Sequence, residues 1–423
     1  MARQRGRPVR QRRRVYRRRR SQRVSRAASD HKALRRTVPL LALVTAIVVA
    51  IEFVVVGLLP SMARDLRISL AAAGGLVSAF ALSAALLGPL LTLAATRLQP
   101  RRSLAAVATI FGVGNLLAAA VPSHGLLLAV RIVEGAILPV FVSVGAGVIA
   151  ILASPERQGR AIAQVNIGTI AGLVFAVPAG VALGTSADWR SVFAGLGVLA
   201  LAGAVALAIG LPTVSTSCRP NVGKQATILR SPLVLGHLVL SATVFAAMFA
   251  SYAYLAAILE IEAGYRGVQV AMLLMGFSAI GLIGNAIGGR VADRRPIEGT
   301  VAALLVVTFA VCAISVAGGH SWLFLPLLAL WGAGHAAGFV LCQVRVMSAA
   351  DEAPAFAMSL NIAACNLGIA VGAVTGGALI EVSGLRMLGV GTAVFAALAV
   401  SSAVIIQRID QLRRAASKVQ AGS

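Results

Sequence analysis

The sequence predicts an all-α membrane protein in which twelve transmembrane helices form two six-helix bundles related by a pseudo-twofold axis. Three observations predict this fold class. The 423 residues are 58% hydrophobic and 12% charged, with a mean hydropathy of +0.89, and a membrane protein is the class that fits this composition. Twelve segments are long and apolar enough to cross a bilayer. The two sets of six also repeat a pattern of small residues at a constant offset.

The first expected span, residues 37–60, contains one acid and no base. As a helix rising 1.5 Å per residue it would be about 36 Å long, enough to cross a hydrocarbon core of about 30 Å. Its acid, Glu52, would lie roughly 12 Å before Pro60. A charged side chain that faces lipid at such a depth costs on the order of 3 kcal/mol. We therefore expect Glu52 to face a protein interior or a watery cavity, which makes it the first candidate for function.

The other spans follow in two groups, separated by a polar segment. The first group is expected at about 70–95, 103–121, 125–152, 161–184 and 191–212, and the second at about 233–258, 268–289, 299–317, 321–344, 355–380 and 387–407. The predicted organisation is therefore a basic tail (1–36), an N-terminal bundle (37–212), a cytoplasmic linker (213–230), a C-terminal bundle (231–407) and a second tail (408–423).

The first tail carries 16 of the 38 Lys and Arg residues of the chain. It has no apolar periodicity, which predicts disorder in solution and attraction to anionic lipid. A leader absent from the mature protein, or a start site placed too far upstream, stays an alternative interpretation. An RNA-binding arm has less support, and we predict no nucleic-acid partner. A twin-arginine signal fits poorly, because the apolar run that follows is too long and contains Glu52.

Basic residues in the short loops predict that both termini face the cytoplasm. With the N-terminus inside, the inner loops would carry twelve Lys and Arg, among them Arg290, Arg294 and Arg345, and the outer loops would carry five. Such an excess marks the cytoplasmic side.

Small residues recur at every fourth position in the fifth and eleventh spans, at an offset of 196 residues. Because each copy contains six spans, both copies would cross the membrane in the same sense, which places the pseudo-twofold axis along the membrane normal. Small residues at this spacing predict close helix packing and would also let the helices slide. The residues with this expected role are Gly168, Gly172, Pro178, Gly180, Gly368, Gly372 and Gly376.

The fourth span contributes a second set of charges, Arg131 and Glu134, which are three residues apart and share a helix face. Arg131 would lie roughly 9 Å below the outer surface, close to the depth of Glu52. One arginine and two carboxylates can therefore share a layer of the N-terminal bundle. Two interpretations stay open: a buried ion pair that fixes helix packing, or a proton site whose proton affinity burial and the arginine set together.

The C-terminal bundle lacks this charged layer, since the offset maps Glu52 near Met248 and Arg131 near Leu327. The asymmetry points to proton coupling in the first half, with the second half determining which substrate is bound. Packing or capping of backbone groups is the alternative role for the polar residues of the second half. The candidates for a substrate cavity are Thr45, Asn115, Asn166, His335, Gln343, Asn361 and Asn366.

The loop after the eighth span is a candidate conformational gate. Gly289 is expected to end the helix, and Asp293 can pair with an arginine such as Arg294 or cap the next helix. The corresponding loop after the second span has Thr96 where an acid could stand. An ordinary positive-inside loop is the alternative.

Several stretches together resemble the major facilitator superfamily, and within it the twelve-span drug:proton antiporter group near the arabinose-efflux-type branch. The matching stretches are Glu52-Phe53 with Gly57-Leu58-Leu59-Pro60, Gly114-Asn115-Leu116-Leu117, Arg131 to Gly135, Trp189-Arg190 with Phe193, and Ser359-Leu360-Asn361 with Asn366-Leu367-Gly368. The resemblance covers about residues 37–407, and only the combination of motifs is specific.

The resemblance implies the major facilitator fold, a role for Arg131 in proton coupling, and a locking role for Asp293-Arg294. Two departures matter. Thr96 replaces the Asp of the first-half loop motif, which puts that latch in doubt. Ala176-Val177-Pro178 replaces the Gly-Pro of the antiporter motif, which weakens the case for export against uptake.

We therefore expect a multi-pass inner-membrane or plasma-membrane secondary transporter that exports a small drug-like or sugar-like compound in exchange for protons. The expected partners are the small-molecule substrate, protons and the lipid bilayer; the chain is expected to act as a monomer and without a cofactor. The alternatives are a proton-coupled importer or facilitator, and a sensor or scaffold without flux, which has little reason to keep Glu52 and Arg131 buried. Four scattered cysteines suggest no metal site, and the absence of a nucleophile–base set argues against an enzyme.

Overall fold

The computed structural model describes residues 7–121, 123–186, 188–214, 231–318, 322–350 and 354–421. Eleven of its helical segments are long and apolar enough to cross a membrane. The pair α2 (Leu70–Leu86) and α3 (Gly88–Ala95), bent by 50°, supplies the twelfth. The prediction of twelve spans is therefore confirmed.

The first half contains six spans, the fifth of which is built from three consecutive pieces. A π-helical turn, η1, ends at Ala176, two residues before Pro178, whose missing N–H and bulky ring locally disturb an α-helix. Besides α2 and α3, the elements are α1 (Arg7–Leu66), α4 (Pro100–Ala120), α5 (His124–Leu152), α6 (Pro155–Ala171), η1 (Gly172–Ala176), α7 (Val177–Ser186) and α8 (Trp189–Gly210).

The second half repeats the plan, and here the first span ends in a π-helical turn. Its elements are α10 (Pro232–Tyr252), α11 (Leu255–Ala257), η3 (Ile258–Glu262), α12 (Val268–Ala292), α13 (Pro296–Ala317), α14 (Phe324–Ser348), α15 (Pro354–Ser383), η4 (Leu385–Met387) and α16 (Leu388–Ala421). The expected linker falls almost entirely on residues 215–230, which lie outside the described residues.

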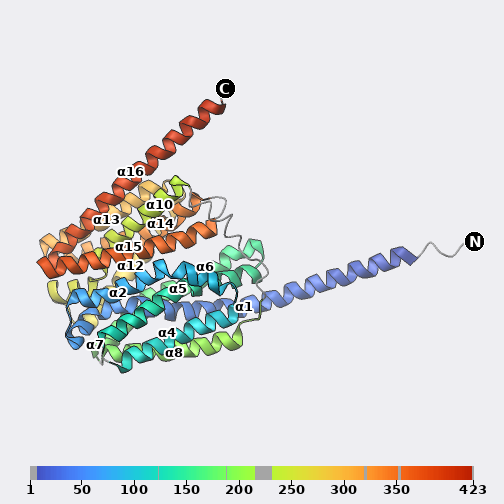
Figure 1. Cartoon of the computed structure of the whole chain (residues 1–423), viewed down its shortest axis with the longest axis horizontal. Helices are drawn as coiled ribbons and strands as arrows, with labels where there is room; N and C mark the ends of the chain where they lie inside the picture. Colours follow the sequence, from blue (N-terminus) through green and yellow to red (C-terminus); the bar gives the residue numbers. More distant parts are fainter. Residues whose placement is uncertain are drawn as a thin grey trace, which may run out of the picture.

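The two halves lie against each other as two layers, with α2 packed on α15 and α7 packed on α12 at the boundary (Figure 1). The N-terminal part of α1 and the C-terminal part of α16 project from the same side of the body (Figure 1). We call this side the tail face. The opposite side, where α1 ends at Leu66 and η3 ends at Glu262, is the distal face.

Helix α1 is longer at both ends than the sequence suggested. Its backbone is helical from Arg7, which corrects the expectation of disorder for residues 7–36; arginine, glutamine and alanine are good helix formers, and the adjoining span supplies the helix nucleus. At the other end the helix continues through Pro60 to Leu66, and the Ser61 hydroxyl donates to the carbonyl of Leu58. Glu52 thus lies about 21 Å from the helix end, nearer the middle of the membrane.

Close packing in the two halves follows the 196-residue offset. A Cβ atom on Gly172 or Gly180 would fall against Ala46 or Val54 of α1. The corresponding positions are Gly368 and Gly376, where a Cβ atom would fall against the carbonyls of Ala242 and Ala250 of α10. The same shift maps the partners onto each other, so that the contact itself is repeated, as a pseudo-twofold arrangement requires. Gly168 and Gly372 are likewise packed against a backbone carbonyl, of Ala42 and Ala246.

Two polar contacts link the halves, and among the described residues both lie at the distal face. Arg64 pairs with Glu260 at 2.9 Å, and the hydroxyl of Ser69 donates to the carboxylate of Glu381 at 2.8 Å. Arg64 and Glu260 are themselves 196 residues apart. They occupy equivalent positions in the two halves, and contact between equivalent positions places the pair beside the pseudo-twofold axis.

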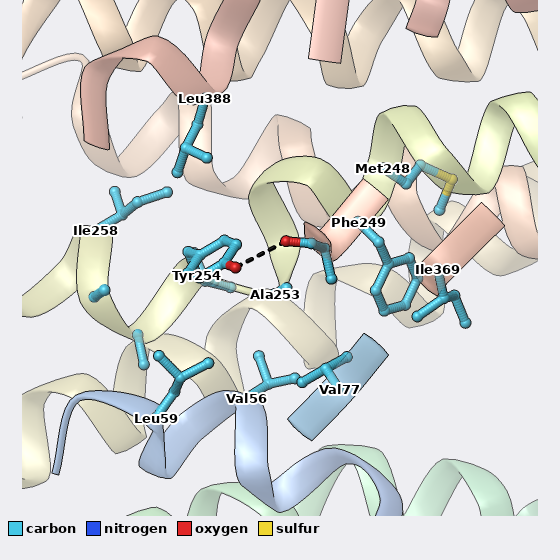
Figure 2. Packing of buried hydrophobic residues seen from close by; sticks show 14 of the residues in the cluster. Val56, Leu59, Val77, Met248, Phe249, Ala253, Tyr254, Ile258, Ile369 and Leu388 are labelled. Atoms are coloured by element: carbon cyan, nitrogen blue, oxygen red, sulfur yellow. Dashed lines mark hydrogen bonds between the residues drawn. The ribbon is translucent and has the colours of Figure 1, made fainter. Parts of the chain in front are cut away.

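A continuous apolar core lies beneath these links. Figure 2 shows Val56, Leu59 and Val77 of the first half facing Ala253, Tyr254 and Ile258 of the second, and all six residues are buried. The hydroxyl of Tyr254 donates to the carbonyl of Ala373 at 2.8 Å, and Gly74 of α2 leaves room for that hydroxyl. The distal face is therefore closed by direct packing between the halves.

Candidate functional site

The three charged residues singled out from the first half meet in one layer. The Arg131 guanidinium donates from Nη2 to the carbonyl of Glu52 at 2.8 Å and from Nη1 to the carbonyl of Ile51 at 3.0 Å. Nη1 also lies 3.1 Å from Oε2 of Glu134. Helix α5 is thus fastened to α1 at the residue that carries the acid.

Arg131 and Glu134 form a fully buried ion pair, each 1% exposed. The guanidinium also lies over the Phe80 ring, 4.2 Å from its centroid, which adds a cation–π contact from α2. The pair therefore joins α1, α2 and α5, and either charge left without the other would be costly in this apolar setting.

Asn115, expected among the cavity residues, belongs to this buried network instead. Its Nδ2 donates to Oε1 of Glu134 at 2.6 Å and to the carbonyl of Phe111 at 2.8 Å. The residue is 0% exposed, because α4 packs on α5 at the very turn that carries Glu134. This corrects the expectation that Asn115 lines a cavity: it supports the orientation of Glu134.

Glu52 differs from Glu134 in its surroundings. Its backbone carbonyl accepts from Arg131, whereas its carboxylate makes no hydrogen bond or ion pair with any described residue. The side chain is partly exposed although it lies near mid-membrane. Its charge acts electrostatically on Arg131 in its own half and on Tyr252 in the other half. Because Glu52 and Tyr252 belong to different halves, the partly exposed Glu52 side chain lies at the boundary between them.

On the other side of that boundary lies an aromatic cluster built by α10, α12 and α14. The Tyr252 and His335 rings are 4.5 Å apart between centroids. Each of them also contacts the rings of Phe249 and Phe277 at 5.2 to 5.9 Å, and Phe339 lies 5.6 Å from His335. Tyr252 and Phe339 are partly exposed, whereas the other three are buried.

Sequence reasoning selected His335 and missed Tyr252. A tyrosine inside an apolar span looks like an ordinary packing residue, and its approach to Glu52 exists only in three dimensions. A signal was nevertheless present, since Tyr252 lies in the span that the repeat pairs with that of Glu52.

The remaining cavity candidates have different environments. Thr45 on α1 and Gln343 on α14 are partly exposed, and Asn166 on α6 is exposed. Asn361 and Asn366 on α15 are 1% and 7% exposed, and their side-chain Oδ1 atoms lack a hydrogen-bond partner. Nδ2 of Asn366 donates to the carbonyl of Ile362, the backbone-capping role that was the alternative for this residue.

Arg345 is not the inner-loop residue that the orientation count assumed. It lies within α14, is 1% exposed, and donates to Nδ1 of His237 at 2.7 Å and to the Ser241 hydroxyl at 2.8 Å. Helix α14 extends four residues beyond the expected span end, which takes Arg345 inside the bundle. Like Arg131, it fastens the fourth span of its half to the first.

The candidate gate, residues 289–294, lies at the tail face, and among the described residues its charged side chains make no contact that would lock it. Helix α12 continues through Gly289 to Ala292, which corrects the expectation that this glycine ends the helix; a glycine in a helix interior costs only about 1 kcal/mol. Asp293 and Arg294 are exposed, and their side chains form no ion pair or hydrogen bond with other described residues. Within the described residues, no group of three or more His, Cys, Asp or Glu could hold a metal ion.

Comparisons with known proteins point to one family. The family model described as Major Facilitator Superfamily matches residues 41–355. The chain is 34% identical over 357 residues to the inner membrane transport protein YdhP of Escherichia coli (strain K12), covering 82% of this chain and 90% of that protein. It is 30% identical over 359 residues to a chloramphenicol efflux pump of Mycobacterium tuberculosis (strain H37Rv), covering 82% of this chain and 86% of that pump.

A solved structure has the same fold. A bacterial homologue of the human lysosomal transporter Spinster, crystallised in an inward-facing and unoccupied conformation, superposes with a TM-score of 0.75 at 15% sequence identity. The match covers 89% of this chain and 97% of that one. At this identity the likeness establishes the arrangement of the helices.

Proposed function

Because the chain belongs to the Major Facilitator Superfamily, and is thus a membrane transporter and not an enzyme, we propose that it exports a small organic compound in exchange for protons. The family fixes the fold and transport in general. The direction, the proton coupling and the substrate are argued from the residues.

The observation that carries the proposal is the contrast between the two buried acids. Glu134 is held by Arg131 and Asn115 and has a structural task. Glu52 sits in the same layer with a carboxylate that is partly exposed and unpaired within the described residues. An exchanger needs a group that can be reached from each side in turn and that changes charge there. Glu52 meets that requirement, and Arg131 fixes its backbone.

Export is supported by the relative named as a chloramphenicol efflux pump. Chloramphenicol is accordingly the first probe, and a sugar such as arabinose is the second, because a drug-like and a sugar-like compound are the two classes expected. Uptake of either compound with the proton gradient would instead identify a proton-coupled importer.

We place the tail face in the cytoplasm. Without the buried Arg345, the predicted inner loops still carry eleven basic residues against five on the other side. Three of those five (Arg64, Arg190 and Arg386) form ion pairs with acids at the distal face, which offsets their charge there. In this orientation the closed distal face is the outer one.

The test uses inside-out vesicles with an imposed pH gradient. Glu52→Gln should abolish gradient-driven accumulation of chloramphenicol while leaving binding or downhill exchange at least partly intact. The companion measurement is substrate-induced proton release from purified protein between about pH 5 and pH 9, which should be lost in Glu52→Gln. Proton release at the parent level in Glu52→Gln, with loss in a well-folded Glu134→Gln, would reverse the assignment of the two acids.

A further inference from the structure

Tyr252 and His335 have polar atoms that the fold leaves unused. Nδ1 of His335 is buried and has no hydrogen-bond partner, in a residue that is 6% exposed. The Tyr252 hydroxyl makes no hydrogen bond with any described residue. Unpaired buried polar atoms are costly and uncommon in native proteins, and a bound molecule is one reason for them to persist.

The two rings are held in fixed positions by their neighbours. Phe249 and Phe277 contact both of them, and Phe339 contacts His335. Packing of this kind leaves the two side chains little freedom to rotate. The polar atoms of Tyr252 and His335 therefore keep a fixed orientation. A phenol and a neutral imidazole can each donate and accept one hydrogen bond. The pair therefore matches a group that does both, such as a hydroxyl or an amine.

The position of the pair connects it to the transport site. Tyr252 lies within electrostatic reach of Glu52 across the boundary between the halves, and both Tyr252 and Phe339, which contact His335, are partly exposed. Flat rings bind aromatic side chains by offset or edge-to-face contact. A molecule between the halves would thus meet a carboxylate from α1 and a polar aromatic surface from α10 and α14.

We propose that Tyr252 and His335 are the specificity-determining pair of this site, and that they select a ring-bearing substrate by hydrogen bonding to a hydroxyl or amine group on the chain attached to its ring. The inference rests on the proposed function, because it takes the Glu52 layer as the transport site. It assigns discrimination to the second half and proton exchange to the first.

The test uses two probes that differ in a single group: thiamphenicol and florfenicol, in which fluorine replaces one hydroxyl of the same ring compound. Equilibrium binding is measured on the purified full chain. The parent should bind the hydroxyl compound about tenfold more tightly, since a site built to hydrogen-bond a hydroxyl rejects the analogue that lacks it. Tyr252→Phe and His335→Phe keep a ring in place and should bring the ratio close to one, chiefly by weakening the binding of thiamphenicol.

Tyr265→Phe is the matched control, because that tyrosine packs on Phe324 at the distal face, away from Glu52. It should leave both affinities unchanged. The proposal is overturned if the parent binds neither probe or prefers neither. It is also overturned if the two aromatic variants keep the parent ratio while their melting temperatures match that of the parent.

The two proposals fail separately. If Glu52→Gln loses proton release but Tyr252→Phe keeps the preference, the proposed function stands and the specificity pair is wrong. If Glu52→Gln releases protons normally while Tyr252→Phe loses the preference, the pair stands and the assignment of the proton site is wrong.

Discussion

At the scale of single residues, the N-terminal half contains two acids in one layer with different surroundings, to which we assign different tasks. Glu134 completes a buried ion pair that joins α5 to α1 and α2, and Asn115 fixes its second oxygen. Glu52 contributes its backbone carbonyl to the same network and keeps its side chain out of it. This division predicts different outcomes for the same chemical substitution.

Glu134→Gln should lower the free energy of unfolding by about 3 kcal/mol, because it leaves the Arg131 charge buried without its counter-ion. Glu52→Gln should change it by less than about 1 kcal/mol, since no partner in the described residues depends on that carboxylate. Thermal unfolding of the purified variants in detergent measures both. Equal losses in the two variants would mean that Glu52 also has a structural partner.

Residues were easiest to predict where local spacing decides their contacts. The ion pair between Arg131 and Glu134 follows from a separation of three along one helix, and it was one of the two interpretations that the sequence left open. Asn115 and Arg345 were assigned wrongly because their environments depend on how α4 and α14 pack, which hydropathy does not report. Tyr252 was missed for the same reason.

At the scale of helices, packing depends on where glycine removes a side chain. On α5, a Cβ atom at Gly135 would collide with the Phe80 carbonyl of α2, whereas a Cβ atom at Gly147 would meet nothing within 4 Å. The contact with α2 therefore requires glycine at position 135 but not at position 147.

Gly135→Ala should destabilise the protein by about 2 kcal/mol, the usual range for forcing a methyl group against a packed backbone. Gly147→Ala is the matched control on the same helix and should be neutral or stabilising by up to about 1 kcal/mol. Melting temperatures of the two variants test the contrast. Similar melting temperatures would show that α2 and α5 can separate at Gly135 without cost.

At the scale of the whole molecule, the number of spans and the repeat were predictable because both follow from the positions of the apolar segments along the chain. The closure of the distal face was not, although the offset of 196 residues places Glu260 opposite Arg64. A repeat identifies equivalent positions; which of them touch depends on the angle between the halves, and this is a property of the conformation.

Because Arg64 and Glu260 occupy equivalent positions, exchanging their charges should preserve the link. Arg64→Glu or Glu260→Arg alone should favour opening of the distal face by about fivefold, the factor that ~1 kcal/mol gives. The double exchange should restore the parent balance. The reporter is Val77→Cys, a position that is 7% exposed between the halves, labelled with a polar maleimide.

Each reporter variant is compared with the same protein lacking Val77→Cys, which corrects for labelling of the native cysteines. A double exchange that labels as fast as either single variant would show that the ion pair does not hold the halves together.

The closed distal face also determines from which side of the membrane a compound can reach the Glu52 layer. In the orientation that we propose, with the tail face in the cytoplasm, a blocking compound added outside meets packed side chains at Tyr254 and Val77 before it meets Glu52. Such a compound has to cross the bilayer and enter from the other side, or bind during the interval when the outer end opens. In pharmacological terms, membrane permeability should govern potency against this resting form, and an impermeant analogue of an equally good ligand should act only while transport is under way.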